Sequence, residues 1–233
     1  MSTDLSGLVV AVTGAAGDAG APAVRHLVSA GATVVAAGRS QSRLDAVVES
    51  ASAGPGRAVA TVVDLLDEQA TRAWGQEILE THGRVDGLLH LVGGWRGGKG
   101  IVEADLADWD FLHDNIIRTL QHASRALHDP IKASPRGRLA IVSTTGLRKP
   151  RAGNAAYLAA KAAAEAWTLA VADSFAGTDA AATVIRVMAL LTPQMRGAKP
   201  DAAFKNYVAV DDLADRLVGL WDSSADEVNG AVL

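Results

Sequence analysis

The chain has 233 residues, no cysteine and a formal net charge of −4, with a sequence pI near 5.8. Hydrophobic residues make up 49% of the sequence and charged residues 21%, which is typical of a globular protein and excludes a disordered one. The lack of cysteine excludes a disulfide framework, a thiolate metal site and a cysteine nucleophile. Lysines and arginines are scattered along the chain, so we expect no nucleic-acid partner.

The N-terminal residues 1–4 carry no basic segment of the kind that begins a signal peptide, and they lead directly into an apolar run. The longest apolar stretches fall well short of the ~18–20 residues that a membrane span needs. We therefore expect a cytoplasmic protein with no membrane partner. The absence of cysteine suits such a reducing compartment.

Short runs rich in β-branched residues alternate with longer amphipathic segments along the chain. The runs predict strands at Leu8–Val12, Thr33–Ala37, Ala58–Val63, Gly87–Val92, Leu139–Ser143 and Thr183–Met188. The segments predict helices at Pro22–Ala30, Ser42–Ala51, Glu68–Thr81, Asp108–Leu127, Ala155–Ala176 and Asp211–Trp221. Strands that are apolar at nearly every position suit a parallel sheet covered on both faces. The sequence therefore predicts a Rossmann-type α/β fold, a doubly wound parallel sheet in a single domain over residues 1–233.

A glycine-rich turn at Thr13–Gly20 (TGAAGDAG) follows the first predicted strand and opens the first helix. Gly14, Gly17 and Gly20 allow a tight turn that brings backbone N–H groups against a pyrophosphate at the helix N-terminus. In this position the turn predicts a dinucleotide-binding loop. Asp18 lies inside the loop, and its carboxylate would repel a phosphate. We expect that Asp18 points away or that the loop has a different shape.

The end of the second predicted strand bears on the choice of cofactor. An NAD site usually carries an Asp or Glu there, whereas an arginine accommodates the 2′-phosphate of NADP. This chain has Arg39 at that point, with Arg43 one helical step further and no carboxylate. Arg39 predicts an NADP site that prefers NADPH to NADH, the alternative being a solvated surface charge. Asp64, at the end of the third strand, is placed to hydrogen-bond the adenine or to cap the next helix.

A second group of polar residues predicts acid–base chemistry. Tyr157 and Lys161 are four residues apart in a predicted helix, so they lie on one face a single turn apart. A free tyrosine has a pKa of ~10, which a nearby ammonium and a cationic nicotinamide would lower. The fifth strand ends in Ser143 and Thr144, where a hydroxyl is able to polarise a substrate carbonyl. Asn115 lies in the preceding helical segment.

These motifs, in this order, resemble the short-chain dehydrogenase/reductase family from about Leu8 to the C-terminus. The resemblance implies that Tyr157 is the acid–base and that Lys161 binds the nicotinamide ribose and lowers the tyrosine pKa. It also implies that Ser143 orients the substrate carbonyl and that Asn115 supports a proton relay. The resulting expectation is an NADP-dependent oxidoreductase that interconverts a small-molecule carbonyl and an alcohol by hydride transfer.

The chain departs from the family pattern at several positions. The family spacing before the tyrosine selects Thr144 as the catalytic hydroxyl, whereas alignment to Gly146 selects Ser143, which we prefer. The usual Asn-Asn-Ala-Gly after the fourth strand is replaced by His90–Gly93 (HLVG), which leaves Gly93 as a cofactor-binding candidate. His90 is expected to be a packing substitute rather than a metal ligand, since the six histidines show no ligand spacing. Thr192 opens a segment that resembles the part of the family fold covering the nicotinamide.

Two alternative functions remain open. The loop Val92–Gly98, which contains Trp95, resembles the matching part of dihydropteridine reductases, and Trp95 would either stack on a flat ring or pack the loop. This resemblance implies reduction of a quinonoid or pteridine ring. Because Asp18 and the lost Asn-Asn-Ala-Gly depart from the family pattern, a non-catalytic NADP-binding sensor is the other alternative.

The segment Ala155–Ala176 is rich in alanine and poor in charge around most of its circumference. One face of a sheet does not cover such a helix completely, so part of it needs another partner. Closed symmetric pairing is the usual way to bury such a surface, and the family resemblance implies the same. We expect a homo-oligomer, either a tetramer or a dimer, with chain loops as the alternative cover.

Overall fold

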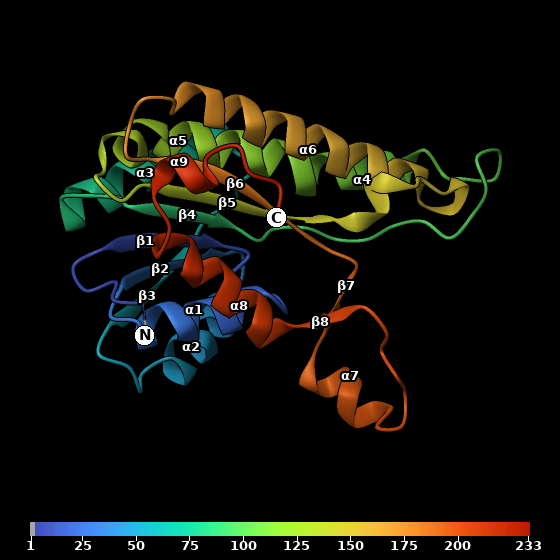
Figure 1. Cartoon of the computed structure of the whole chain (residues 1–233), viewed down its shortest axis with the longest axis horizontal. Coiled ribbons are helices and arrows are strands. Elements are labelled where there is room, and N and C mark those ends of the chain that lie inside the picture. The colour runs from blue at the N-terminus through green and yellow to red at the C-terminus, as the bar shows by residue number, and fades with distance from the viewer. Residues whose placement is uncertain (1–2) are drawn as a thin grey trace.

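Six parallel strands form the central sheet in the order β3-β2-β1-β4-β5-β6 (Figure 1). The computed structural model describes residues 3–233, so the first two residues of the N-terminal prediction lie outside the described part. The strands are β1 (Val9–Thr13), β2 (Thr33–Gly38), β3 (Arg57–Val62), β4 (Gly87–His90), β5 (Arg138–Thr144) and β6 (Ala181–Val187). Every pairing in this sheet is parallel. The predicted α/β fold is confirmed.

The six predicted helices are also present, one of them as part of a longer run, and a short helix at Ala225–Val228 was not predicted. They are α1 (Gly20–Ser29), α2 (Gln41–Ser50), α3 (Glu68–His82), α4 (Ala107–Leu112), α5 (Thr119–Ala133), α6 (Ala155–Ser174), α8 (Val210–Val218) and the short α9 (Ala225–Val228). A π-helical turn, His113–Arg118, joins α4 to α5 without a break. The segment expected at Asp108–Leu127 is therefore one longer run that begins at Ala107 and ends at Ala133.

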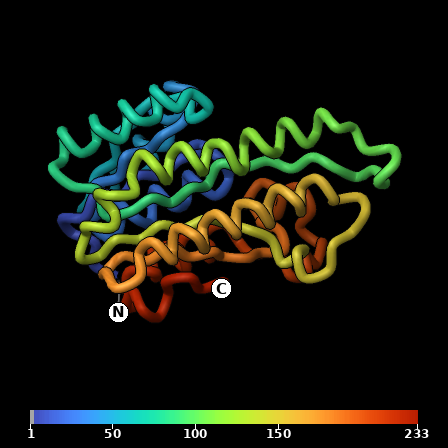
Figure 2. The backbone as a smooth tube through the Cα atoms, turned by 90° about the horizontal axis from the view of Figure 1, so that it is seen from above, coloured from blue at the N-terminus to red at the C-terminus, as the bar shows by residue number. Residues whose placement is uncertain are grey.

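Two layers of helices cover the sheet. Helices α3, α5 and α6 lie on one face and α1, α2 and α8 on the other, and Figure 2 shows the first group side by side across the top of the molecule (Figures 1 and 2). Neighbouring residues of a strand point to opposite faces, so Leu88 belongs to the first core and Leu89 to the second. Both side chains are fully buried. This explains why the strands are apolar at consecutive positions.

A small second sheet lies beyond the end of β6. It pairs β7 (Ala189–Leu191) with β8 (Tyr207–Ala209), and the short helix α7 (Pro193–Ala198) lies between them. Figure 1 shows α7 projecting away from the two helical layers on the side of α8. These three elements were not predicted, because runs of three to six residues show no usable periodicity.

The strand order places a crevice at one end of the sheet. β1 lies between β2 and β4, so the chain changes direction across the sheet after β3. In such sheets ligands bind at the carboxyl ends of the strands, beside this switch point. Within residues 3–233, no helix is long and apolar enough to cross a bilayer. The same residues contain no group of three or more histidine, aspartate or glutamate side chains arranged for a metal ion.

Candidate active site

Two adjoining cavities open at the carboxyl ends of the strands. The first has a volume of about 380 Å³ and the second about 430 Å³. Four residues line both of them, namely Gly17, Leu91, Val92 and Gly93. The cavities are therefore two halves of one cleft, which lies at the switch point between β1 and β4. The predicted cofactor residue Gly93 sits where the two halves meet.

The glycine loop forms the floor of this cleft. Gly14 has a φ of +69°, and a Cβ atom built there would lie 2.8 Å from the carbonyl carbon of Leu91. The Gly17 N–H donates to the Gly14 carbonyl oxygen at 2.9 Å, which closes the turn. Gly20 lies buried beneath the turn, where a Cβ atom would collide with the same carbonyl oxygen. Glycine is thus required at positions 14 and 20 by the close approach of backbone segments.

Asp18 lies in a different half of the cleft from the arginines. It is exposed and lines the second cavity, next to Ala19, but it does not line the first. The carboxylate thus belongs to the part of the cleft that holds the predicted catalytic residues.

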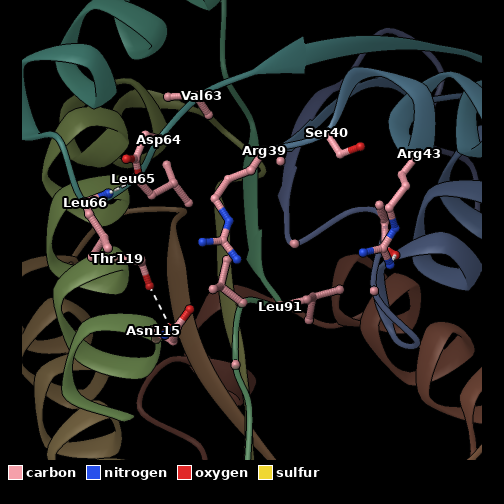
Figure 3. Close-up of a pocket in the computed structure, with 16 residues that line it drawn as sticks. Arg39, Ser40, Arg43, Val63, Asp64, Leu65, Leu66, Leu91, Asn115 and Thr119 are labelled. Atoms are coloured by element: carbon pink, nitrogen blue, oxygen red, sulfur yellow. Dashed lines mark hydrogen bonds between the residues drawn. The ribbon is translucent and has the colours of Figure 1, made fainter. Parts of the chain in front are cut away.

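Arg39 and its neighbours line the first cavity. In Figure 3 the Arg39 side chain extends from the end of β2 into the middle of the cavity, toward the side occupied by Asp64 and Leu66. The Arg43 guanidinium turns back and donates to the carbonyl oxygen of Ala16 at 2.5 Å. Arg43 therefore holds the glycine loop, a role that the sequence analysis missed. The order of strands and helices could have indicated this contact, because it brings the start of α2, which carries Arg43, beside the turn after β1.

Asp64 is exposed at the end of β3 and also lines the first cavity. Its carboxylate accepts a hydrogen bond of 3.0 Å from the Leu66 N–H, within the loop before α3. The cap of α3 is Asp67, which accepts from the Ala70 N–H at 3.0 Å. The alternative interpretation of Asp64 as the helix cap is therefore wrong, because the helix begins at Glu68, four residues later.

Tyr157 and Lys161 line the second cavity from α6. The Lys161 ammonium lies 5.9 Å from the centre of the Tyr157 ring and donates to the Val142 carbonyl oxygen at 2.7 Å. Burial lowers the pKa of Lys161 to about 8, while Glu165 one turn further along α6 opposes that shift. Burial raises the pKa of Tyr157 above its ordinary value of 10.0. The lowering of the Tyr157 pKa expected from Lys161 is not seen, because the phenolate would lose its hydration in the cleft.

Glu165 is the buried member of an ion pair that the sequence analysis missed. Its exposed fraction is 6%, and Arg186 on β6 donates to both of its carboxylate oxygens. Lys161 and Glu165 are four residues apart on one face of α6, which was the available signal. The pair balances the charge of Glu165 next to the buried lysine.

The two candidate hydroxyls differ in their surroundings. Ser143 is 2% exposed and lines the second cavity with Tyr157 and Lys161. Among residues 3–233, no group hydrogen-bonds the Ser143 Oγ. The Thr144 Oγ1 instead accepts from the Gly146 N–H at 3.1 Å and caps the short 3₁₀ turn that follows β5. Adjacent strand residues point to opposite faces, which explains why only Ser143 lines the cavity.

Asn115 lies in the π-helical turn and lines the first cavity, together with Thr119. Its side-chain amide donates to the Phe111 carbonyl oxygen at 2.8 Å. Tyr157 and Lys161 line the second cavity, so Asn115 approaches the cleft from the other half. The structure brings all three to the cleft without a direct hydrogen bond between Asn115 and Lys161, whose ammonium is bonded to β5.

The segment after β6 contributes different residues from the one predicted. Thr192 caps α7 by accepting from the Met195 N–H at 3.1 Å, and it lines neither half of the cleft. Met188–Leu190, just upstream, line the second cavity instead. Trp95 lines the same cavity and is 58% exposed. Trp95, Met188 and Leu190 therefore give the second cavity an apolar part of its wall.

The sequence profile of the short chain dehydrogenase family matches residues 8–202. The ketoacyl reductase HetN of Nostoc sp. is 27% identical over 183 residues, which cover 78% of this chain and 63% of HetN. The chain thus aligns with slightly less than two thirds of HetN.

Solved structures share the fold over the whole chain. A short-chain type dehydrogenase/reductase from Mycobacterium ulcerans superposes with a TM-score of 0.88 at 21% identity, covering 100% of this chain and 88% of that one. A short chain dehydrogenase from Burkholderia cenocepacia, solved in complex with NADP, gives 0.85 at 24% identity, covering 99% and 97%. The narrower resemblance to dihydropteridine reductases is not shown by these comparisons. The match over residues 8–202 establishes that the chain belongs to the short-chain dehydrogenase/reductase family of oxidoreductases.

Proposed function

We propose that the protein is an NADP-dependent enzyme that interconverts a small-molecule carbonyl and an alcohol by hydride transfer, with Tyr157 as the acid–base. One observation carries the proposal. Ser143 presents a buried hydroxyl, without a hydrogen-bond partner among residues 3–233, to the cavity that Tyr157 and Lys161 also line. A buried hydroxyl normally has a partner, so one without any is suited to a ligand oxygen.

The three side chains divide the work on the substrate. The Ser143 hydroxyl donates to the carbonyl oxygen and stabilises the negative charge that develops on it. Tyr157 transfers its phenolic proton to that oxygen in the direction of reduction and takes it back in oxidation. The Lys161 ammonium, held against β5 through Val142, stabilises the phenolate that reduction leaves on Tyr157. We assign Asn115 a supporting role in proton transfer, and Thr144 the role of a cap rather than of a catalytic group.

The cleft fits a dinucleotide. The close backbone approach at Gly14 and Gly20 shapes the turn that leads into the N-terminus of α1, where a pyrophosphate is favoured. We propose that the cofactor is held by Gly14, Gly17, Gly20, Arg39, Asp64, Gly93, Tyr157 and Lys161. Asp18 lines the half of the cleft that holds Tyr157 and Lys161, and Thr192 contributes only by capping α7. When bound, the nicotinamide supplies or accepts the hydride.

Arg39 supports NADP as the preferred form. It extends into the first cavity from the end of β2. Residues 38–40 are Gly, Arg and Ser, so this loop contains no carboxylate. A guanidinium offers a planar fork that matches a phosphate. The Burkholderia cenocepacia relative was solved with NADP, which is consistent with this preference.

The apolar wall formed by Trp95 and Met188 favours a substrate with an apolar body beside its carbonyl group. We further propose that residues 1–233 act as one domain and assemble into a homo-oligomer. Exposed residues of α6 recur on one side of the helix, at Ala159, Ala162 and Ala166. Such a face is suited to close packing of a second helix.

The test is a panel of aldehydes, ketones, quinones and a quinonoid dihydropteridine, assayed by the loss of NADPH absorbance. Turnover of a carbonyl compound is expected, and Tyr157→Phe is expected to lower kcat at least about 100-fold while NADPH affinity is retained. If Tyr157→Phe keeps more than about a tenth of kcat, Tyr157 is not the proton donor. NADPH binding without turnover of any compound would favour the sensor, and turnover of the pteridine alone would favour ring reduction.

A further inference from the structure

His90 ends β4 at the switch point of the sheet and is 3% exposed. It lines the second cavity with Tyr157 and Lys161, yet the proposed chemistry gives it no task. A polar ring in this position needs partners, because burying an unpaired imidazole is costly. Its two nitrogens have such partners, and they come from β1 and α5.

The ring makes two hydrogen bonds. The His90 Nδ1 lies 2.8 Å from the Thr13 Oγ1, and the Nε2 lies 3.2 Å from the Thr119 Oγ1. The Thr119 hydroxyl donates its one proton to the Asn115 carbonyl oxygen at 2.9 Å. It must therefore accept from His90, which requires the proton on Nε2. In a neutral ring Nδ1 is then the acceptor, and Thr13 is the donor.

The π-helical turn explains why the Asn115 carbonyl needs this hydroxyl. In an α-helix the Thr119 N–H would donate to the carbonyl oxygen of Asn115, four residues back. Here it donates to Asp114, five residues back, as in a π-helix. The Thr119 hydroxyl thus donates the hydrogen bond to the Asn115 carbonyl oxygen that the Thr119 N–H does not make. The orientation of the turn that carries Asn115 depends on that hydroxyl.

The other end of the link belongs to the glycine loop. Thr13 is the last residue of β1 and directly precedes Gly14, which lies against the backbone of Leu91. The Leu91 N–H donates to the Thr13 carbonyl oxygen at 3.0 Å. Backbone and side-chain bonds therefore both tie Thr13 to β4. A shift of His90 would therefore displace the first turn of the glycine loop.

The charges around His90 favour its neutral form. Burial, together with the charge of Lys161 on α6, lowers the pKa of His90 from 6.5 to about 3. Lys161 is the charged group that faces the ring, while its partners from β1 and α5 are uncharged hydroxyls. Neutrality keeps the direction of both hydrogen bonds constant across the physiological pH range.

We propose that His90 is a positioning residue that couples the glycine loop, through Thr13, to the turn carrying Asn115, through Thr119, and that it does so as the neutral tautomer protonated on Nε2. This inference assigns His90 a place in the site of the proposed function. The coupling itself is a property of the folded chain and does not require turnover.

The tautomer is tested by NMR of the whole protein labelled with ¹⁵N-histidine. A His90→Asn variant identifies the His90 signals among those of the six histidines. The expected result is a protonated Nε2 and an unprotonated Nδ1 that do not titrate between about pH 5 and 8. A proton on Nδ1, or a titration in that range, would overturn the proposal.

The coupling is tested through the amide signals of Asn115 in the same protein without substrate. Thr119→Val removes the hydroxyl and should move these signals directly. Thr13 does not contact Asn115, so Thr13→Val should move the Asn115 signals only if His90 transmits the change. Thr13→Ser and Thr119→Ser keep the hydroxyls and should restore the original positions. Unchanged Asn115 signals in Thr13→Val would show that the two ends are independent.

The consequence for chemistry is measured with a carbonyl substrate of the parent enzyme. Thr119→Val is expected to lower kcat about tenfold or more through misplacement of the turn. KM for NADPH should change less than kcat, and Thr119→Ser should recover most of the loss. A fall in thermal stability alone, with kcat intact, would reduce His90 to a packing role. If the parent turns over no carbonyl, the proposed function fails, while the NMR results still decide the coupling.

Discussion

The Lys161 ammonium donates a 2.7 Å hydrogen bond to the Val142 carbonyl oxygen and lies 5.9 Å from the centre of the Tyr157 ring. One side chain thus joins the middle of α6 to the end of β5. Because Ser143 follows Val142 directly, the same bond also fixes the positions of Ser143 and Tyr157 relative to each other. The relative placement of strand and helix is therefore the feature on which the predictions for this site depend.

The two hydroxyls at the end of β5 are expected to respond in opposite ways to mutation. Ser143→Ala removes a hydroxyl that makes no hydrogen bond within residues 3–233, so stability should change little while kcat falls about 100-fold or more. Thr144→Val removes the cap on the Gly146 N–H and should lower the free energy of unfolding by about 1 kcal/mol. Its kcat should stay within about threefold of the parent.

Steady-state kinetics and urea denaturation of both variants check this pair. Each variant serves as the control for the other, because the residues are adjacent and lose the same group. The opposite pattern, with a large loss of kcat in Thr144→Val, would transfer the catalytic role to Thr144.

Cofactor preference should follow the charge at the end of β2. We expect NADPH to bind at least tenfold more tightly than NADH, a difference of ~1.4 kcal/mol, because Arg39 faces the first cavity. Arg39→Asp should reverse the order by repelling the 2′-phosphate. Isothermal titration calorimetry of the parent and the variant with NADPH and NADH measures these affinities. Arg216→Asp, at an exposed position of α8, is the control for an equal change in net charge. Equal affinities of the parent for both nucleotides would contradict the proposal.

Stability is expected to depend on the protonation of His90. Its pKa is about 3 in the folded chain against an ordinary 6.5, so between these values the unfolded chain binds a proton that the folded chain does not. This contribution to stability is complete above pH 6.5 and is lost as the pH falls toward 3, at up to ~1.4 kcal/mol per pH unit. His90→Asn should reduce that slope, measured by urea denaturation at several pH values. Identical slopes in parent and variant would show that His90 titrates normally.

Assembly is expected to involve the exposed side of α6. Leu169 on this side is 38% exposed, and the alanines beside it leave room for a second helix. Light scattering should return two or four times the chain mass of 24.0 kDa at micromolar concentration. Ala166→Glu should lower the mass by placing a charge in the contact, whereas Ala73→Glu on the exposed side of α3 should not. A parent mass near 24.0 kDa would exclude the oligomer.

Local patterns determined the order of the elements and the position of the glycine loop. Strands buried on both faces need apolar residues at consecutive positions, so β1, β2 and β5 were visible in the sequence within one residue of their ends. Gly14 and Gly20 were equally visible, because a glycine-rich turn between a strand and a helix is a pattern within a few consecutive residues. The pairing of Tyr157 with Lys161 required only the helical period.

Tertiary structure decided the features that depend on contacts between distant segments. Ser143 and Thr144 are equivalent as letters, and only the face that each presents at the end of β5 separates them. The raised pKa of Tyr157 follows from burial, which no local pattern gives. His90 is a lone histidine in the sequence, and its partners Thr13 and Thr119 come from β1 and α5. Hydrogen bonds between residues 29 and 77 positions apart exist only once the sheet and its helices have packed.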